Sequence, residues 1–478
     1  MSFTSFQFLW VFPLFVLFYN LVTQKYRAIL LLITSYLFYL NMQPVLFIML
    51  LIVTALTYFS AHYITHQDDD DKRVLGLRIG VVCTLLPLLF FKYFNFLANT
   101  LVTGLQLIGL EIHPITTNFV LPIGISFYTF MAIGYLVDVF NEEVEFEPNY
   151  ISVSLFLSFF PYILSGPIER AGNMFEQFKN LKRSTWNGLV SGLKLMLWGY
   201  FMKLCIADRL ALYNDLIFTS IPNRSGSTLA IASLLYPIQV YADLGGYTLI
   251  VMGISKCLGI KIIPNFNRPF LATSISEFWR RWHISLIKWL TDYIFTPLSF
   301  TLRSWKLWGI ITALMLTFFI SGIWHGASFC FIFWGLMQGA LLSFEAYTNP
   351  KRNKFEEKYH LRHKGAYNFI CILFVYFVFA FTEIWDKEGV TWNETMLILH
   401  KIFHEWGTPY LILSKFLYAS IAFIPLLFSE LRNEYKPERF LFFDHKNIFI
   451  RWTSYLIILF MILTIGVLNS SQFIYFQF

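Results

Sequence analysis

An all-α, polytopic membrane protein is the fold class that the sequence predicts, and two observations support it. Of the 478 residues, 57% are hydrophobic and only 14% are charged, whereas a soluble globular chain carries about 25% charged residues. The hydrophobic residues also form runs of about 20 residues, the length that an α-helix needs to cross a bilayer. We therefore expect a single integral membrane domain over residues 1–478.

The hydrophobic runs indicate roughly 10 to 13 membrane-embedded segments, counting about 20 residues per span. The first run, 6–22, lacks a basic leader and a small-residue cleavage site, so we expect a retained helix and not a removed signal peptide. The second run, 28–64, is broken near Asn41–Pro44 and predicts a pair of helices. The other candidates are 77–97, 118–140, 151–165, 188–217, 229–258, 284–300, 308–346, 367–385, 409–429 and 452–475.

Two stretches are too rich in Pro and Gly to be simple spans: Leu121-Pro-Ile-Gly-Ile125 and Phe160-Pro-Tyr-Ile-Leu-Ser-Gly-Pro167. Broken backbone at membrane depth is tolerated only where protein or a cavity covers it. The sequence therefore predicts an irregular, hollow bundle with re-entrant segments. The longest polar connectors are expected near 347–366 and 430–450.

The charge distribution predicts the topology and excludes one class of partner. Lys25 and Arg27 follow the first run and favour an external N-terminus, with the basic loops 166–187, 256–281 and 349–364 in the cytoplasm. The net charge of +7 is scattered among apolar segments, which does not indicate nucleic acid binding. The five cysteines form no CxxC pair, and the pairs His360/His363 and His400/His404 lack carboxylate or cysteine partners, so we expect no metal site.

His325 is an ionisable residue in an apolar stretch of the chain. It lies in Ser321-Gly-Ile-Trp-His-Gly-Ala-Ser328, between the uncharged runs Ile310–Ile320 and Phe329–Trp334. An ionisable side chain at membrane depth is costly unless it faces a protein interior or a watery cavity, so by default it marks a functional site. Taken alone, the position fits a catalytic histidine and an interior histidine bonded to a carbonyl equally well.

A second histidine, His283, ends the basic and aromatic stretch Ser274-Ile-Ser-Glu-Phe-Trp-Arg-Arg-Trp-His283. We expect a helix here, on which Trp279 and His283 are i,i+4 neighbours that share a face. The planar guanidinium groups of Arg280 and Arg281 suit phosphate or pyrophosphate. That anion is either a lipid headgroup at the membrane interface or the phosphate of a nucleotide-bearing or phosphopantetheine donor.

At these motifs the sequence resembles the membrane-bound O-acyltransferase (MBOAT) family. The likeness is to its bacterial alginate O-acetyltransferase branch, which is related to the teichoic-acid D-alanyl transferases. Eight pieces occur in the order of the family, and together they make the match specific. They are Phe91–Phe96, Leu121–Phe130, Ser165–Arg170, Lys203–Arg209, Tyr241–Tyr247, Asn267–Phe270, Glu277–Ser285 and Gly322–Gly326.

The resemblance implies an MBOAT-type bundle around a tunnel that crosses the membrane, with its core at about 90–345 and flanking helices on both sides. His325 matches the catalytic histidine of the family and His283 its second histidine. A base must accept the hydroxyl proton during acyl transfer from a thioester, and a buried imidazole favours its neutral form. We expect His325 to be that base and His283 to orient the donor or handle a second proton.

The other site residues are hypotheses of the same kind. Trp279, Arg280 and Arg281 are expected to contact the donor, while Trp324 and Asp243 are expected to line the tunnel. Packing between helices is the alternative role for Asp243.

The function implied is transfer of an acetyl group toward hydroxyls of an extracytoplasmic polysaccharide at the bacterial inner membrane. Acetyl-CoA or an acyl-carrier thioester is the expected co-substrate, no cofactor is expected to be tightly bound, and membrane lipids surround the chain. An extracytoplasmic or membrane-anchored acetyltransferase is the expected partner. Two alternatives stay open: acyl or D-alanyl transfer to a teichoic acid, lipid or peptide, and an acyl-group conduit or transporter without intrinsic chemistry.

Overall fold

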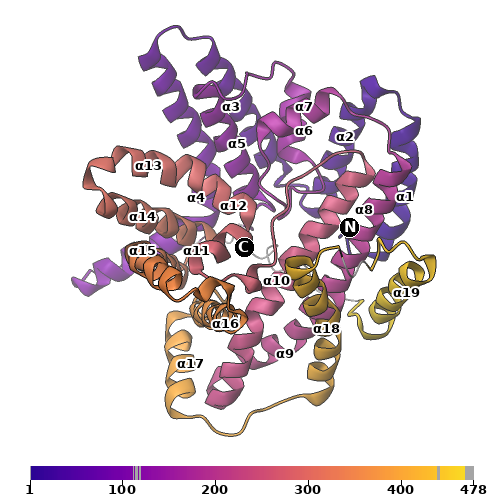
Figure 1. Cartoon of the computed structure of the whole chain (residues 1–478). Coiled ribbons are helices and arrows are strands. Elements are labelled where there is room, and N and C mark those ends of the chain that lie inside the picture. The colour runs from indigo at the N-terminus through magenta and orange to yellow at the C-terminus, as the bar shows by residue number, and fades with distance from the viewer. Residues whose placement is uncertain (1, 111, 114–116, 118–119, 439–441, 469–478) are drawn as a thin grey trace.

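The computed structural model describes residues 2–110, 112–113, 117, 120–438 and 442–468. The described residues form helices, turns and loops, and no β-strand occurs among them, which confirms the all-α prediction (Figure 1). Eight helices in this part of the chain are long and apolar enough to cross a membrane. They are α3 (Phe47–Thr65), α4 (Asp70–Leu107), the continuous run Trp186–Phe218, α14 (Leu307–His325), α15 (Phe329–Lys358), α16 (Gly365–Thr382), α18 (Leu413–Tyr435) and α19 (Ile448–Ile465).

The remaining helices are shorter or more polar than these spans. Two short apolar helices are α1 (Phe6–Leu21) and α5 (Ile125–Phe140). The others are α2 (Gln24–Met42), α6 (Tyr150–Ser158), α7 (Ala171–Lys179), α10 (Gly226–Cys257), α11 (Ile275–Arg281), α12 (Ile284–Leu290), α13 (Thr296–Thr301) and α17 (Trp392–His404).

Two expectations about these elements are corrected. The segment 284–300 is not among the eight candidate spans, although α12, a π-helical turn over Thr291–Phe295 and the six-residue α13 form one continuous helical run. The polar connector expected over 347–366 is mostly helix, since α15 continues to Lys358. Polar composition at that point reflects the end of a long helix that leaves the apolar layer, and not a loop.

The helical pair predicted within 28–64 is confirmed as α2 and α3, which are separated between Met42 and Phe47. Gln43 lies in this break and satisfies backbone groups of the irregular 121–124 segment. Its amide nitrogen donates to the carbonyl of Leu121 at 3.1 Å, and its amide oxygen accepts from the N–H of Ile123 at 2.8 Å. Non-helical backbone away from water needs such partners.

The two Pro/Gly-rich stretches pack directly against each other. Gly124 has φ +74°, and a Cβ on it would lie 2.0 Å from the carbonyl oxygen of Ile163. Only glycine fits this left-handed position at such close approach. The backbone of Phe160 donates to the buried hydroxyl of Ser35 on α2 at 3.0 Å. Both stretches are therefore covered by protein, as the sequence predicted for re-entrant segments.

The centre of the bundle is formed by α10 and the run before it. That run consists of α8 (Trp186–Phe201), a π-helical segment (Met202–Ala207) and α9 (Asp208–Phe218). Most side chains of α10 are buried, and the long α10 crosses the middle of the molecule between the α14–α16 group and the α18–α19 pair (Figure 1).

The hairpin of α14 and α15 places His325 at its turn. The backbones approach closely because glycines face each other: a Cβ on Gly335 would lie 2.3 Å from the carbonyl oxygen of Phe318, and one on Gly322 2.4 Å from that of Phe331. Small residues at the crossing are the usual way for membrane helices to pack closely. This contact fixes the position of the α14 C-terminus relative to α15.

Replacing Gly335 by Ala is expected to destabilise the protein by about 1–3 kcal/mol, because the added methyl group overlaps backbone that cannot move aside. Thermal unfolding of the detergent-solubilised protein measures this as a lower midpoint. Gly104→Ala is the control, since nothing lies within 4 Å of a Cβ there. An unchanged midpoint for Gly335→Ala would show that the hairpin is looser than described.

Candidate active site

His325 is the last residue of α14, and its side chain is buried, with 6% exposed. The helix ends there because Gly326 turns the backbone into an extended conformation and Ser328 begins α15 as its N-cap. The Ser328 hydroxyl accepts from the N–H of Cys330 at 3.2 Å. The imidazole is therefore held on a short, capped turn between two tightly packed helices.

Two residues of α4 satisfy the last carbonyls of α14. Lys92 donates from Nζ to the carbonyl oxygens of Trp324 at 2.5 Å and His325 at 3.2 Å. The neighbouring Tyr93 hydroxyl donates to the carbonyl of Ile323 at 2.5 Å. The final carbonyls of a helix have no partner within the helix, so α4 caps the end that carries His325.

Two carboxylates that follow α16 complete the surroundings of His325. Nδ1 of His325 lies 3.2 Å from Oδ1 of Asp386. The Trp334 ring lies 4.5 Å from the His325 ring, and its Nε1 donates to Oε1 of Glu383 at 3.1 Å. Burial raises the pKa of Asp386, and burial together with the charge of Asp386 raises the pKa of Glu383. Each of these buried carboxyl groups therefore keeps its proton to a higher pH than a solvent-exposed carboxyl group does, and ionises above that range.

His283 lies between helices, which corrects the expectation that it shares a helical face with Trp279. α11 ends at Arg281, and His283 begins α12 with φ +45°. A non-glycine residue in this region costs about 1–3 kcal/mol and needs surrounding structure to hold it. Asn265 supplies that support: its carbonyl accepts from Ile284 N–H at 2.8 Å, and its Oδ1 accepts from the Ser285 N–H at 3.0 Å and hydroxyl at 2.8 Å.

The strained turn brings His283 to the same tryptophan as His325. The Trp324 ring centroid lies 5.9 Å from His283 and 5.3 Å from His325, edge to face in both cases. Burial, with a smaller effect from His325, lowers the pKa of His283 to about 3. His283 is therefore neutral at ordinary pH. The two histidines predicted 42 positions apart in the sequence thus flank one indole.

The expected donor-contacting residues occupy three different environments. Trp279 is buried and packs against Trp334 at 5.8 Å and Phe318 at 5.0 Å. Arg280 is exposed. Arg281 binds Glu434 of α18 through both terminal nitrogens, at 2.9 and 3.1 Å, and Glu277 at 2.6 Å. Contact between these residues and a donor stays a prediction. For Arg281, such contact requires the donor to displace one of the carboxylates that bind it.

The two residues expected to line a tunnel border different cavities. Trp324 lines a small one beside His325, together with Lys92, Ser126 and Phe127. Its volume of about 10 Å³ holds about one water molecule. Asp243 borders a second cavity of about 540 Å³. A continuous tunnel between such cavities stays a prediction.

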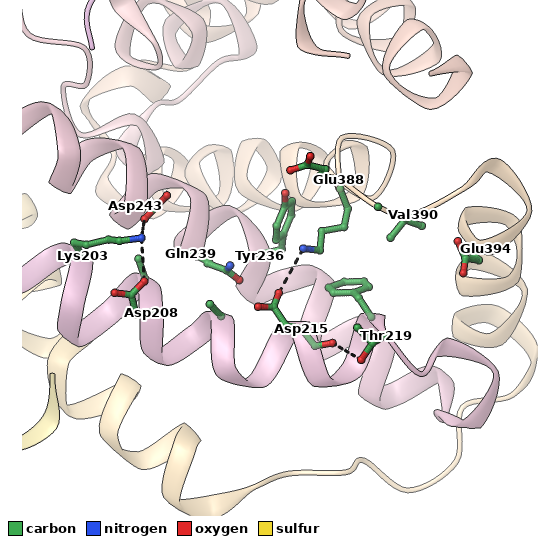
Figure 2. Close-up of a pocket in the computed structure, with 15 residues that line it drawn as sticks. Lys203, Asp208, Asp215, Thr219, Tyr236, Gln239, Asp243, Glu388, Val390 and Glu394 are labelled. Atoms are coloured by element: carbon green, nitrogen blue, oxygen red, sulfur yellow. Dashed lines mark hydrogen bonds and ion pairs between the residues drawn. The ribbon is translucent and has the colours of Figure 1, made fainter. Parts of the chain in front are cut away.

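Asp243 belongs to a buried cluster of charges. Lys203 donates to Asp243 and lies 3.0 Å from Asp208, and all three side chains are at most 5% exposed (Figure 2). A buried ion pair stabilises a helix contact only when its partners are satisfied together. Asp243 therefore takes part in a contact between helices and also lines the large cavity. Its role in a tunnel stays a prediction.

Four residues around His325 were missed in the sequence: Asp386, Glu383, Lys92 and Trp334. Lys92 lies inside the apolar run 77–97, and Glu383 and Asp386 end the apolar run 367–385. The rule that marks His325, an ionisable residue in apolar sequence, would have found Lys92 and the two carboxylates. It would not have found Trp334, one of 14 tryptophans.

Comparison with known proteins shows the class to which this fold and site belong. Residues 134–384 match the MBOAT, membrane-bound O-acyltransferase, family. The chain belongs to this family and is a multi-pass membrane O-acyltransferase.

The names of three relatives refer to three different acceptors. The chain is 35% identical to the probable alginate O-acetylase AlgI of Pseudomonas putida over 360 residues, 74% of this chain and 73% of the relative. It is 32% identical to the peptidoglycan O-acetyltransferase of Helicobacter pylori, over 67% of this chain and 65% of the relative. It is 26% identical to the teichoic acid D-alanyltransferase of Bacillus subtilis, over 55% and 66%. The predicted likeness to both branches is confirmed.

Replacing Lys92 by Met is expected to lower stability by about 1–3 kcal/mol, because two carbonyls at the end of α14 lose their donor away from water. Activity should fall as well, since the same carbonyls fix His325. Thermal unfolding and acyl transfer are measured on the same preparation. The control is Lys72→Met on the same helix, where the side chain is 60% exposed. Equal behaviour of the two variants would contradict the capping role.

Proposed function

We propose that this protein transfers an acetyl group from a cytoplasmic thioester to hydroxyls of an extracytoplasmic polysaccharide at the bacterial inner membrane. The observation that carries the proposal is the buried contact of His325 with Asp386, at 3.2 Å, beside the Trp324 ring that also touches His283. The relatives named as acetylases of alginate and peptidoglycan support the acetyl group and the polysaccharide acceptor.

The chemistry follows from the ring nitrogens of His325. With Nδ1 lying 3.2 Å from Asp386, Nε2 is the nitrogen that takes the proton of the attacking hydroxyl. The hydroxyl oxygen bonds to the thioester carbonyl carbon, the carbon–sulfur bond breaks, and the thiolate leaves and is protonated by the imidazolium. Ionised Asp386 stabilises the positive imidazolium, as a carboxylate does beside a catalytic histidine. The enclosure of the site keeps water from the thioester.

His283 and the arginines belong to the donor side of the proposal. His283 is neutral and buried, so it suits a hydrogen-bonding role toward the acyl group or the sulfur. Arg280, Arg281 and Trp279 would contact acetyl-CoA or an acyl-carrier thioester near its phosphates. Because Glu434 and Glu277 hold Arg281, the phosphate would have to replace a carboxylate that already fits the guanidinium fork.

The proposal includes a partner, an extracytoplasmic or membrane-anchored acetyltransferase that acts together with this protein. D-Alanyl transfer is the second candidate, supported by the Bacillus subtilis relative. A conduit without chemistry is disfavoured by the His325–Asp386 pair, which transport alone does not require.

His325→Ala or His325→Gln is expected to reduce acetyl transfer by on the order of 10²–10⁴-fold, the usual contribution of a general base. The measurement is the ester-linked acetyl content of surface polysaccharide in a strain that lacks the protein and is complemented with each variant. The exposed His62 provides the control His62→Ala. Full restoration by His325→Ala would reject the assignment, and D-alanyl ester in place of acetyl ester would favour the second candidate.

Asp386→Asn tests the orienting carboxylate through the pH dependence of transfer. Burial raises the pKa of Asp386, so the wild-type carboxyl is protonated at low pH and activity should rise as it ionises. The asparagine variant should be slower by roughly tenfold or more and should lose this acid limb of the profile. Asp68→Asn, in an exposed loop, is the control. An unaltered acid limb would mean that Asp386 does not act through its charge.

A further inference from the structure

A polar cavity lies between α9, α10 and the segment that follows Asp386. Its volume is about 540 Å³, within the range of sites that bind small organic molecules. Figure 2 shows Asp215 on α9, Tyr236 and Gln239 on α10, and Glu388 and Val390 on the segment across from them. The lining combines carboxylates, an amide and aromatic rings.

The wall of this cavity is continuous with the surroundings of His325. Lys387, Glu388, Gly389 and Val390 line the cavity, and they directly follow Asp386, which lies 3.2 Å from the imidazole. Burial raises the pKa of Glu388 against the opposing charges of Lys387 and Lys92. Lys92 is the residue that caps the carbonyls of Trp324 and His325. A ligand bound in the cavity would therefore influence the surroundings of His325.

The cavity is acidic. Its lining holds the lysines Lys203 and Lys387 and five carboxylates, a formal excess of three negative charges; the carboxylates are Asp208, Asp215, Asp243, Glu388 and Glu394. Both lysines already have acidic neighbours: Lys203 binds Asp243 and Asp208, and Lys387 lies 3.7 Å from Asp215 (Figure 2). Protonation of Glu388, whose pKa is raised, would still leave an excess of two.

These features select one class of ligand. Carboxylates and the Gln239 amide accept or donate hydrogen bonds with sugar hydroxyls. The rings of Tyr236 and Phe218, over which the Lys387 ammonium lies at 4.9 and 5.6 Å, add apolar surface to the lining. A uronate or a phosphodiester would bring like charge into a partly enclosed acidic site, where repulsion is stronger than in bulk water. The lining accepts hydroxyls and rejects anions.

We propose that this cavity binds the acceptor, and that the acceptor unit is a hydroxyl-rich sugar without a carboxylate or phosphate group. The inference rests on the proposed acetyl transfer and adds the class of acceptor to it. It separates this chain from enzymes whose acceptor polymer carries a negative charge on each unit. The reacting hydroxyl would approach His325 along the 386–390 segment.

The test compares two short oligosaccharides of equal length, one of neutral hexose or N-acetylhexosamine and one of uronic acid, as acceptors for the full-length protein in lipid nanodiscs. If the acceptor requires the partner, membranes that contain both proteins replace the nanodiscs. The neutral oligosaccharide should have the lower KM, and the difference should shrink with added salt because screening weakens the repulsion. Equal KM values, or a preference for the uronate, would overturn the proposal.

A charge-neutralised variant separates repulsion from shape. Asp215→Asn with Glu394→Gln removes two negative charges from the lining and should lower the KM for the uronate, relative to the KM for the neutral acceptor, by roughly tenfold at low salt. Asp68→Asn with Glu357→Gln neutralises two exposed acids outside the cavity and is the matched control. An unchanged uronate KM in the cavity variant would reject the electrostatic argument.

A variant that fills the cavity provides a second test, in which continued hydrolysis of the thioester shows that the protein is still folded. Val390→Trp fills the cavity from the 387–390 segment and should raise the acceptor KM at least about tenfold, while slow hydrolysis of the thioester by water continues. If acylation of every acceptor is independent of His325, the proposed function itself has failed. If transfer depends on His325 but ignores all cavity variants, only the acceptor assignment has failed.

Discussion

The carbonyl groups at the end of α14 must find hydrogen-bond donors away from water, and the catalytic region depends on how they do so. Lys92 and Tyr93 reach across from α4 and supply donors to the carbonyls of Ile323, Trp324 and His325. An unsatisfied buried carbonyl costs about 1–3 kcal/mol, so these contacts hold α4, α14 and the imidazole in one arrangement. Asp386 then needs only to meet a ring whose position is already fixed.

Buried charged side chains elsewhere in the bundle must also find partners, and there the partners are carboxylates instead of backbone carbonyls. Lys203 is buried between two aspartates on neighbouring helices, at the floor of the large cavity. Arg281 is only partly exposed and is bound by Glu434 and Glu277. A buried pair is weak evidence for net stability, but removal of one member leaves an uncompensated charge. Such pairs fix the relation between helices more firmly than apolar packing alone.

The sequence predicts what local pattern encodes and misses what depends on contacts across the chain. Helix type, the α2–α3 break and the two irregular stretches follow from apolar runs and from Pro and Gly, which act within a few residues. The segment 284–300 forms one helical run that includes a π-helical turn, yet it is not among the helices that are apolar enough to cross a membrane, since polar residues such as Lys288 and Asp292 lie within it. His325 stands out as an ionisable residue in apolar sequence, whereas its pairing with Asp386 is visible only in the folded structure.

His283 is the clearest example of a position that the local sequence does not predict. Periodicity places it one turn after Trp279 on a continuous helix, a sound inference from local propensity. Asn265 instead stabilises a left-handed turn at His283, because it accepts three hydrogen bonds from the 284–285 backbone and the Ser285 hydroxyl. No local signal in Ser274–His283 encodes those partners. The turn is what allows His283 and His325 to meet at Trp324.

Some of the groups that surround the two histidines lie outside the family match at 134–384. Lys92 precedes it, Asp386 lies two residues beyond it, and Glu434, which binds the Arg281 that leads into the His283 turn, lies in α18. The histidines themselves lie inside the match. The charge around the two histidines is thus completed by segments on both sides of this match. On the proposed function, residues 387–390 line the cavity for the acceptor while Asp386, next to them in the chain, pairs with the base.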